Sequence, residues 1–441
     1  MADFIHAPEL SLFANPIHSK GISRLQYIDY RPVGQLNDDS VIEFNIPGCG
    51  SQYLNLKDTK LHMKVQITDE NNQAIGQDDL VGFIATPLHS MFSQIDILLQ
   101  QESVTPSSNL YPYKAYTEKL INQSTATSHP QSQAELYIRD GNADMLKSNN
   151  IDQAKPIPAN AAEQNKGLYL RSRYTNLGRV LDLEAPLHCD IAQQDRFILN
   201  SVDVRVRLFP SQNAFRLMTA SATKYKVKII DIYLRVCKVL VSPEVILAHD
   251  HTLQIKPAVY PFWKTTLKTF TIPQGQYTAN IDDPFQGVIP TKLFVWFVDA
   301  AAFNGDYGKN PFNYHHYYVK SAGFYVNGLS VPNQPLEMDF EHRDIITAYN
   351  ALLDTAGKSS PNTDFDITPK DFANGFTILG FNLETNSINT LDYLVKPQDA
   401  HSRLEIRFGK ATTEPVNIMM MAVHPQLMHI DHMRNVSTSI E

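Results

Sequence analysis

The sequence predicts an all-β protein made of two tandem eight-stranded jelly rolls, with short helices and long surface loops. Three observations support this fold class. The composition, with 20 Tyr, 22 Phe, 26 Pro and 19 Gly in 441 residues, suits short strands joined by turns. A set of short motifs occurs twice in the same order. Each half also holds about eight strand-like segments, the number in a jelly roll, with a helix at the same place.

The repeat begins with Ile-Pro, Gln-Tyr and Thr-Lys-Leu motifs. The first copies occupy 46–47, 52–53 and 59–61, and the second copies occupy 272–273, 276–277 and 291–293. The offset between these copies is 226 (272 − 46), 224 (276 − 52) and 232 (291 − 59) residues. Beyond the predicted helix the offset falls to about 200 residues: Gly178 corresponds to Gly375 (375 − 178 = 197) and Val204 to Leu404 (404 − 204 = 200). A surface excursion at 123–167, present in the first unit alone, explains this fall.

The first unit is predicted to follow an irregular N-terminal arm, residues 1–35, which contains three prolines. The first jelly roll is predicted over 36–242, because apolar and polar residues alternate in several segments there. Examples of the apolar positions are Leu61, Met63, Val65, Ile67, Val202, Val204, Val206, Leu208, Tyr225, Val227 and Ile229. A helix is expected at 111–122, where Tyr113, Tyr116 and Leu120 fall on one helical face.

The second unit is predicted to begin after Pro243, which ends the last strand of the first. We interpret 243–258 as a linker, 259–428 as the second jelly roll and 429–441 as a C-terminal tail. The continuous apolar run Leu293–Val298 indicates a strand that is buried on both faces. A helix then follows, with Ile345, Ile346, Tyr349, Leu352 and Leu353 at helical spacing.

Charge and cysteine content narrow the range of functions. A net charge of −8 without a basic run argues against sequence-specific nucleic-acid binding. Three scattered cysteines favour a reducing compartment. We expect neither a secretory signal nor a membrane span, because no apolar run approaches about 18 residues. A charged fraction of 19%, below the usual level of roughly 25%, suggests that some outer surface is buried against partner chains.

Several longer stretches resemble the double jelly-roll major capsid proteins of Polinton/Maverick elements and the related adintoviruses. The combination of PLHSMFSQIDILLQQ (87–101) with NLYPYKAYTEKLI (109–121) carries most of this resemblance. Other similar stretches are LSLFANP (10–16), VIEFNIPGCGSQYLNLKDTKLHMKVQI (41–67), RLEIRFGKATTEPVNIMMMAV (403–423) and IDHMRNV (430–436). Together they cover most of the chain.

The resemblance implies a hexon-like structural protein and not an enzyme. Three copies would form a homotrimer whose six jelly rolls give a nearly hexagonal outline, and such capsomers would build an icosahedral shell. The implied partners are other copies, neighbouring capsomers and penton or minor capsid proteins. The implied location is the virion, assembled inside the host cell. The excursion 123–167 is then expected in the outer tower, and the arm 1–35 against neighbours or the shell interior.

No catalytic, cofactor-binding or metal site is predicted. Gly357-Lys358-Ser359 resembles the end of a phosphate-binding loop, but Leu352 stands where its first glycine should be. The close histidine groups lack a third ligand for zinc; they are His249 with His251, His315 with His316, and His429 with His432. We interpret the other candidates as turns, loop tips or core: Gly48-Cys49-Gly50, Asp38-Asp39, Asp78-Asp79, Asp282-Asp283, Cys189, Cys237, Trp263 and Trp296.

Two functions from other classes stay open on the sequence alone. Some secreted glycan-processing amidases use two adjacent jelly rolls and need carboxylates and aromatic residues that converge between the domains. A tandem β-sandwich binding module, such as a lectin, is the second alternative. Secretion would be expected for both and disulfides for the binding module, and the sequence indicates neither.

Overall fold

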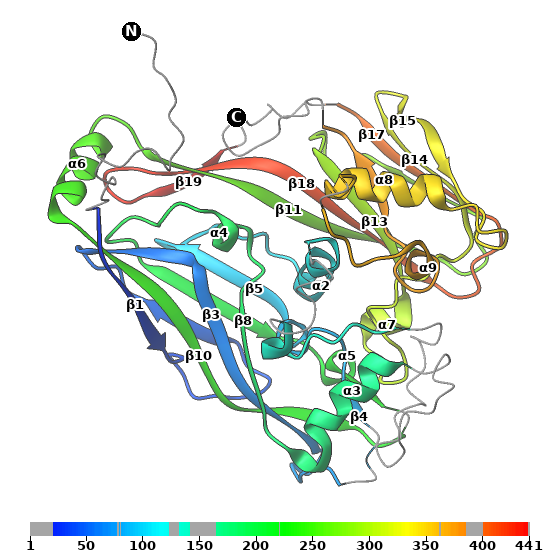
Figure 1. Ribbon diagram of the computed structural model, residues 1–441, viewed down its shortest axis with the longest axis horizontal. Coiled ribbons are helices and arrows are strands. Elements are labelled where there is room, and N and C mark those ends of the chain that lie inside the picture. The colour runs from blue at the N-terminus through cyan, green and yellow to red at the C-terminus, as the bar shows by residue number, and fades with distance from the viewer. Residues whose placement is uncertain are drawn as a thin grey trace, which may run out of the picture.

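The structure, a computed structural model, describes residues 21–76, 79, 81–122, 132–141, 165–219, 221–360, 363–384 and 400–439. It contains two β-sandwiches that lie against each other, with short helices in the connections (Figure 1). Each sandwich consists of two sheets that enclose apolar side chains. The predicted all-β class is therefore confirmed.

The first sandwich has one sheet in the order β1-β10-β3-β7 and a second in the order β2-β8-β5-β6. Their bounds are β1 (Ile22–Tyr30), β2 (Ile42–Ile46), β3 (Gln52–Asp69), β5 (Phe92–Leu99), β6 (Glu102–Ser103), β7 (Leu181–Pro186), β8 (Val204–Pro210) and β10 (Tyr225–Val241). The predicted alternation holds in β3, where Leu61, Met63 and Val65 have no exposed surface and face the core.

The second sandwich has the sheets β11-β18-β13-β16 and β12-β17-β14-β15, and β19 adds to β18. Their bounds are β11 (Ala258–Ile272), β12 (Thr278–Asp282), β13 (Lys292–Asp299), β14 (Val319–Val326), β15 (Leu329–Glu337), β16 (Leu379–Asn382), β17 (Ser402–Phe408), β18 (Val416–Ile430) and β19 (Val436–Ser439). The run Leu293–Val298 lies in β13 and is buried on both faces, as predicted.

The two sandwiches share one strand order. Numbered one to eight within each sandwich, the strands lie in the order 1-8-3-6 in one sheet and 2-7-4-5 in the other. All of these strand pairs are antiparallel. This arrangement is a jelly roll occurring twice, so the double jelly roll is confirmed.

The remaining elements lie in the connections between these strands. The strands β4 (Val81–Phe83) and β9 (Leu217–Thr219) form a separate two-stranded ribbon. The helices are α1 (Pro87–Ser90), α2 (Tyr111–Asn122), η3 (Ser132–Glu135), α3 (Lys166–Thr175), η5 (Asn176–Gly178), α4 (Asp190–Gln193), α5 (Asn213–Arg216), α6 (Pro243–Leu253), α7 (Ala300–Asn304), α8 (Ile346–Ala356) and α9 (Pro369–Phe372). Both α2 and α8 lie between strands five and six of their rolls, as the repeat predicted.

Part of the sequence repeat aligns strands that are not equivalent. The Thr-Lys-Leu motifs do fall on the third strand of each roll, β3 and β13. Ile46, however, ends the second strand of the first roll, whereas Ile272 ends the first strand of the second roll. The connection between the fifth and sixth strands is longer in the first roll (104–180) than in the second (338–378). This difference agrees with an insertion in the first unit.

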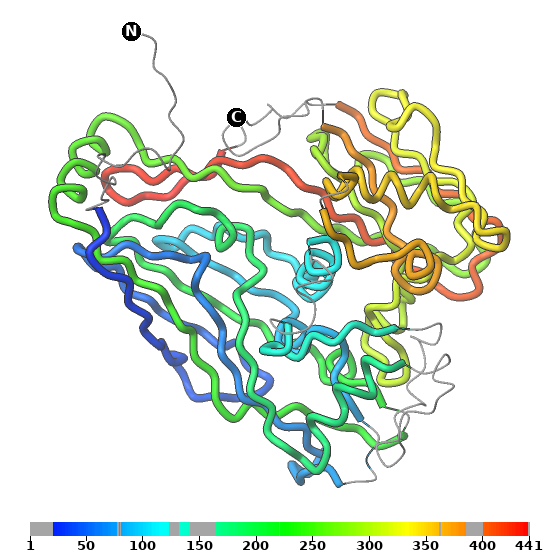
Figure 2. Tube along the Cα trace, in the orientation of Figure 1, coloured from blue at the N-terminus to red at the C-terminus, as the bar shows by residue number. Residues whose placement is uncertain are grey.

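The predicted N-terminal arm extends too far along the chain. Residues 22–30 form β1, which pairs with β10 along its whole length from Ile22↔Val241 to Tyr30↔Leu234. Figure 2 shows this dark-blue strand beside the green β10, although about 200 residues separate them in the sequence. The first jelly roll therefore begins before residue 35, and residues 1–20 of the predicted arm lie outside the described residues.

Two further predicted boundaries need correction. The linker 243–258 is a helix, α6, for most of its length, because Pro243 at the first helical turn both ends β10 and favours a helix start. The C-terminal tail is also ordered in its described part. Its residues Val436–Ser439 form β19, which pairs with the end of β18.

Candidate functional site at the junction between the two jelly rolls

The helix α2 lies between the two jelly rolls, in the residues where the sequence predicts it (Figure 1). Ten of its twelve residues are buried, which is expected of a helix covered on all sides. Its Tyr116 ring stacks on Phe312 of the second roll at 4.3 Å between centroids. The Thr117 hydroxyl lies 2.9 Å from the Tyr314 hydroxyl. We call this contact region, with α4 and residues 132–141, the junction.

A buried ion pair ties the first roll to the first strand of the second. The Lys114 ammonium on α2 lies 2.5 Å from Asp190 Oδ1 on α4, and both side chains are at most 10% exposed. The other oxygen, Asp190 Oδ2, accepts a hydrogen bond from the Thr265 backbone N–H at 2.9 Å, in β11. Burial alone would lower the pKa of Lys114, but Asp190 and Glu118 together raise it above its ordinary value. The ammonium therefore stays charged.

Two histidines extend this polar cluster into the first roll. His188 Nδ1 lies 2.9 Å from Glu118 Oε2. His89, which has no exposed surface, lies 3.0 Å from the Tyr111 hydroxyl through Nδ1 and 3.1 Å from Glu135 Oε2 through Nε2. The two imidazole rings meet edge to face at 4.7 Å. If either imidazole is protonated, its positive charge lies next to the other imidazole ring.

Acidification is expected to weaken the fold through these buried histidines. Burial, followed by the charges of His188 and Lys119, lowers the pKa of His89 well below 6.5. Burial also lowers the pKa of His316 to about 3 and that of His424 to about 4. Because the unfolded chain takes up these protons near pH 6.5 and the folded protein does not, stability falls as the pH drops below 6.5. Each such histidine contributes up to about 1.4 kcal/mol per pH unit.

The check is urea unfolding of His89→Gln at pH 7.5, 6.5 and 5.5, compared with the unchanged chain. The variant should show a smaller loss of unfolding free energy below pH 6.5, because one proton uptake is removed. His342→Gln is the matched control, since His342 is exposed and pairs with Asp339 on the surface. If His89→Gln and the unchanged chain showed the same pH dependence, this would contradict the prediction that buried His89 weakens the fold in acid.

Residues 132–141 pack into the junction, which corrects the prediction that 123–167 is a surface excursion throughout. Ser132, Glu135, Leu136, Tyr137 and Asp140 are all buried. The guanidinium of Arg139 reaches the second roll, 3.0 Å from Asp366 and 2.8 Å from Asp371. It also lies over the Phe376 ring at 4.2 Å. Residues 123–131 and 142–164 lie outside the described residues.

A second buried ion pair fixes the end of this segment. Neither Arg171 on α3 nor Asp140 has any exposed side-chain surface, and Arg171 Nη2 donates to Asp140 Oδ1 at 2.6 Å. The same guanidinium donates to the Phe83 carbonyl at 2.8 Å and to the Ile138 carbonyl. Asp140 Oδ2 accepts from the Asn310 side chain of the second roll at 2.9 Å. The pair thus holds three segments of the chain together.

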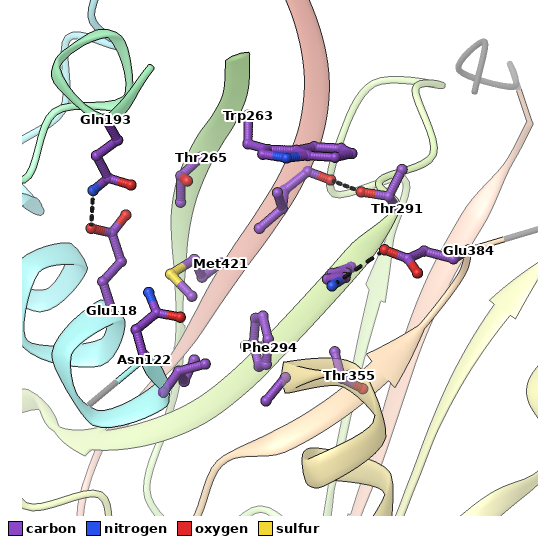
Figure 3. A pocket seen from close by; sticks show the side chains of 14 residues that line it. Glu118, Asn122, Gln193, Trp263, Thr265, Thr291, Phe294, Thr355, Glu384 and Met421 are labelled. Atoms are coloured by element: carbon purple, nitrogen blue, oxygen red, sulfur yellow. Dashed lines mark hydrogen bonds and ion pairs between the residues drawn. The ribbon is translucent and has the colours of Figure 1, made fainter. Parts of the chain in front are cut away.

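A cavity of about 240 Å³ lies between α2, α8 and the sheet that contains β11, β13 and β18 (Figure 3). Its lining combines the apolar Trp263, Phe294 and Met421 with the carboxylates of Glu118 and Glu384. Both carboxylates are occupied. Glu118 accepts from Gln193 at 3.1 Å, and Glu384 lies 3.3 Å from the Lys292 ammonium. A general acid or base needs a carboxyl group that is free to exchange a proton with a substrate. The contacts of Glu118 and Glu384 therefore favour a structural role for these two carboxylates over a catalytic one.

The structure does not build a metal site from any of the three histidine groups in the described residues. His249 and His251 lie on the helix α6 and not on a strand, so they do not share a face, and His249 Nδ1 lies 2.9 Å from the Tyr53 hydroxyl. His315 and His316 stack on each other at 4.4 Å. His429 lies 3.3 Å from the Ser439 hydroxyl. Within the described residues, no three His, Cys, Asp or Glu side chains gather as a metal site would require.

The other described sequence candidates lie in turns, loops or the core, except that the exposed Asp282 ends β12 and Trp263 lies in β11; Asp78 lies outside the described residues. Gly357 ends α8 in the left-handed conformation, with φ 68°. A helix end of this kind favours glycine, so the residue is explained without a phosphate-binding loop. Trp296 is fully buried, whereas Trp263 lines the cavity. Cys189 and Cys237 are buried, and Cys49 is exposed. No helix in the described part of the chain is long and apolar enough to cross a membrane.

Sequence reasoning missed the charged residues that are buried or paired at the junction, together with Arg171 of α3, which pairs with Asp140. The junction residues among them are Lys114, Glu118, Lys119, Glu135, Arg139, Asp140 and Asp190. One local signal was present, because Lys114 and Glu118 are four residues apart on a predicted helix that is otherwise mostly apolar. The other partners are distant in sequence and leave no local pattern.

The strand order and the two joined rolls place the chain in the double jelly-roll class. Solved structures from viruses share this fold over nearly the whole chain. A chain of the Sputnik virophage structure superposes with a TM-score of 0.63 at 12% identity, covering 100% of this chain and 93% of the other. The mavirus major capsid protein gives 0.52 at 12% identity, covering 100% and 96%. The Faustovirus major capsid protein gives 0.52 at 10% identity, covering 94% and 92%.

One relative is similar in sequence. The uncharacterized protein F54H12.2 of Caenorhabditis elegans is 26% identical over 416 residues, which are 89% of this chain and 92% of that protein. No protein-family model matches the chain.

Proposed function

We propose that this chain is a major capsid protein that forms trimeric capsomers of nearly hexagonal outline in an icosahedral shell. The observation that carries the proposal is the pair of jelly rolls with one strand order, joined through a buried junction. The fold it shares with the mavirus and Faustovirus major capsid proteins supports the same role.

Tandem duplication explains how such a chain could tile a shell. A threefold axis places three copies, and two similar rolls in each copy give six similar corners. Hexagonal tiles need rolls that keep a fixed relation to each other. The ion pairs Lys114–Asp190 and Arg139–Asp371 provide this rigidity, because each contributes to the contact between the rolls.

The finer assignment that we propose is a capsid protein of the Polinton/Maverick–adintovirus type. The stretches 87–101 and 109–121 resemble that group, and they form α1, β5 and the junction helix α2. A nematode relative that matches almost end to end favours an element residing in an animal genome. Penton or minor capsid proteins would be its further partners, and the virion, assembled inside the host cell, its location.

The two alternative functions have less support in the described residues. An amidase needs carboxylates free to act at the seam between the rolls, whereas Glu118, Glu384 and Asp190 each contact a cationic or amide group there. A secreted binding module would be expected to contain disulfides, and the three cysteines of this chain are unpaired.

The test combines size-exclusion chromatography, light scattering and negative-stain microscopy of the purified full chain. We expect particles with the mass of three 49.8-kDa chains and a six-cornered outline. A monomer that persists at high protein concentration would contradict the capsid assignment. Hydrolysis of glycoprotein substrates by that monomer would favour the amidase instead.

A further inference from the structure

The buried polar cluster at the junction contains a lysine and a carboxylate in direct contact. Lys119 lies in the last turn of α2, and its ammonium contacts Glu135 Oε1 at the end of η3. Their side chains are 12% and 9% exposed, and the centre of the Tyr137 ring lies 4.9 Å from the ammonium nitrogen. Glu135 is the one carboxylate within ion-pair distance of Lys119 among the described residues. The pair is therefore shielded from water and has no second countercharge in this part of the chain.

An environment of this kind favours an uncharged lysine. Burial lowers the pKa of Lys119 from 10.5 to about 7. Moving the proton from the ammonium to the carboxylate leaves an amine beside a carboxylic acid, which removes two charges that are costly to bury. Lys114, by contrast, faces both Asp190 and Glu118, and these two carboxylates hold its proton. Lys119 is thus the junction lysine whose nitrogen lone pair is available for nucleophilic attack.

A histidine occupies the other oxygen of the same carboxyl group. His89 Nε2 lies 3.1 Å from Glu135 Oε2, and His89 Nδ1 lies 3.0 Å from the Tyr111 hydroxyl. Burial raises the pKa of Tyr111 well above 10, so its phenol keeps its proton and donates it to Nδ1. The single ring proton of neutral His89 is then on Nε2 and points at Glu135 Oε2. An N–H donor therefore stands where negative charge develops when an amine attacks the carboxyl carbon.

We propose that Lys119 and Glu135 condense into an isopeptide bond, with His89 as the catalytic residue. A proton first moves from the ammonium to Glu135 Oε1. The amine lone pair then attacks Glu135 Cδ, and the negative charge on Oε2 is stabilised by the His89 N–H. Oε1 finally leaves as water, with the proton it received and one further proton from the nitrogen. One C–N bond forms, one C–O bond breaks, and no oxidant or cofactor takes part.

The site favours this step for two physical reasons. Groups held in contact react at an effective concentration of about 10⁵ M or more, and the shielding from water removes the reagent that would reverse the condensation. A neutral amide also replaces a buried ion pair. The bond would tie α2 covalently to residues 132–141, whose Arg139 contacts the second roll. The inference goes beyond the proposed function, because the bond forms within one chain whatever the number of copies in the particle.

The experiment is a peptide map of the purified full chain by mass spectrometry. Trypsin does not cut after an acylated lysine, so the linked chain should yield one looped peptide, 115–139, lighter than its sequence by one water molecule. The unlinked chain should yield two peptides, 115–119 and 120–139. Fragmentation should place the link between Lys119 and Glu135. Recovery of the two separate peptides alone, or a loss of water located at other residues, would overturn the inference.

Two controls show whether burial and the free amine are needed. Lys119→Arg keeps a positive charge without a nucleophilic amine, so the full chain of this variant should have the mass of its sequence. Lys57 and Asp195 form an ion pair at 2.5 Å, but their side chains are 57% and 73% exposed. Trypsin should therefore cut normally after Lys57. A link at this exposed pair as well would overturn the argument from burial.

The role of His89 is tested by the rate of bond formation in freshly synthesised chain. His89→Phe keeps a buried ring but removes the N–H donor, so the looped peptide should accumulate about 100-fold more slowly. His342→Phe is the matched control, because His342 is exposed and pairs with Asp339 on the surface; its rate should equal that of the unchanged chain. An equal rate in His89→Phe would overturn the role given to His89. Should that variant not fold, the peptide map of the unchanged chain decides whether the bond exists.

Discussion

An Arg171→Ala variant is expected to lose about 3–5 kcal/mol of its free energy of unfolding, because it strips a buried ion pair of one partner. Asp140 would lose its cationic partner in a place without any exposure to water, and its remaining described contact would be the Asn310 amide. The carbonyl groups of Phe83 and Ile138 would also lose a donor. Urea unfolding at pH 7, followed by circular dichroism, measures the loss.

The control for this prediction lies two residues further along the same helix. Arg173 is exposed and its described contact is a position over the Tyr169 ring, 5.9 Å from the centroid. Arg173→Ala should change the unfolding free energy by about 0.5 kcal/mol or less, as surface substitutions usually do. Similar losses in the two variants would show that helix propensity, and not the buried pair, accounts for the effect.

A Lys114→Met variant is expected to be destabilised by a similar amount, about 3–5 kcal/mol. Methionine keeps most of the apolar stem, so the change isolates the charge. It leaves the carboxylates of Asp190 and Glu118 buried without their ammonium partner. Because Asp190 also holds the Thr265 backbone, the two rolls should become less firmly joined. Denaturant unfolding measures the stability, and limited proteolysis near α4 reports the loosened junction.

The chain offers a matched comparison for the role of burial. The ion pair Lys57–Asp195 has the same 2.5 Å separation as Lys114–Asp190, but its side chains are 57% and 73% exposed. Lys57→Met should therefore cost at most about 1 kcal/mol, since water screens an exposed pair. If Lys114→Met were no more costly than Lys57→Met, the junction would not depend on this charge.

The tandem rolls could be predicted because their evidence is local. Alternation along β3 and the apolar run of β13 show in a few consecutive residues which faces are buried. β1 escaped prediction for a related reason. As an exposed edge strand with a bulge near Ile22 and Arg24, it has no alternation of buried and exposed residues to detect. Its place is set by pairing with β10, and that pairing leaves no pattern within Ile22–Tyr30.

The junction could not be predicted because its contacts join residues that are far apart in the chain. Lys114 meets Asp190 across 76 positions, and Arg139 meets Asp366 across 227. Taken singly, each of these charged residues is typical of a solvated surface. Only the folded topology shows that they are buried and paired. For the same reason the sequence of 132–141, which is rich in polar residues, predicts a surface loop although the segment is largely buried.

In each roll the first strand pairs with the last one, and this pairing has a consequence for the synthesis of the chain. Ile22 pairs with Val241 and Ala258 with Ile430, so neither roll can complete its sheet until its last strand has left the ribosome. The core of the first roll also includes Tyr260 and Met428 from the second. An early-folded first roll would thus leave this apolar surface exposed until translation nears its end, and exposed apolar surface favours aggregation of a partly folded chain.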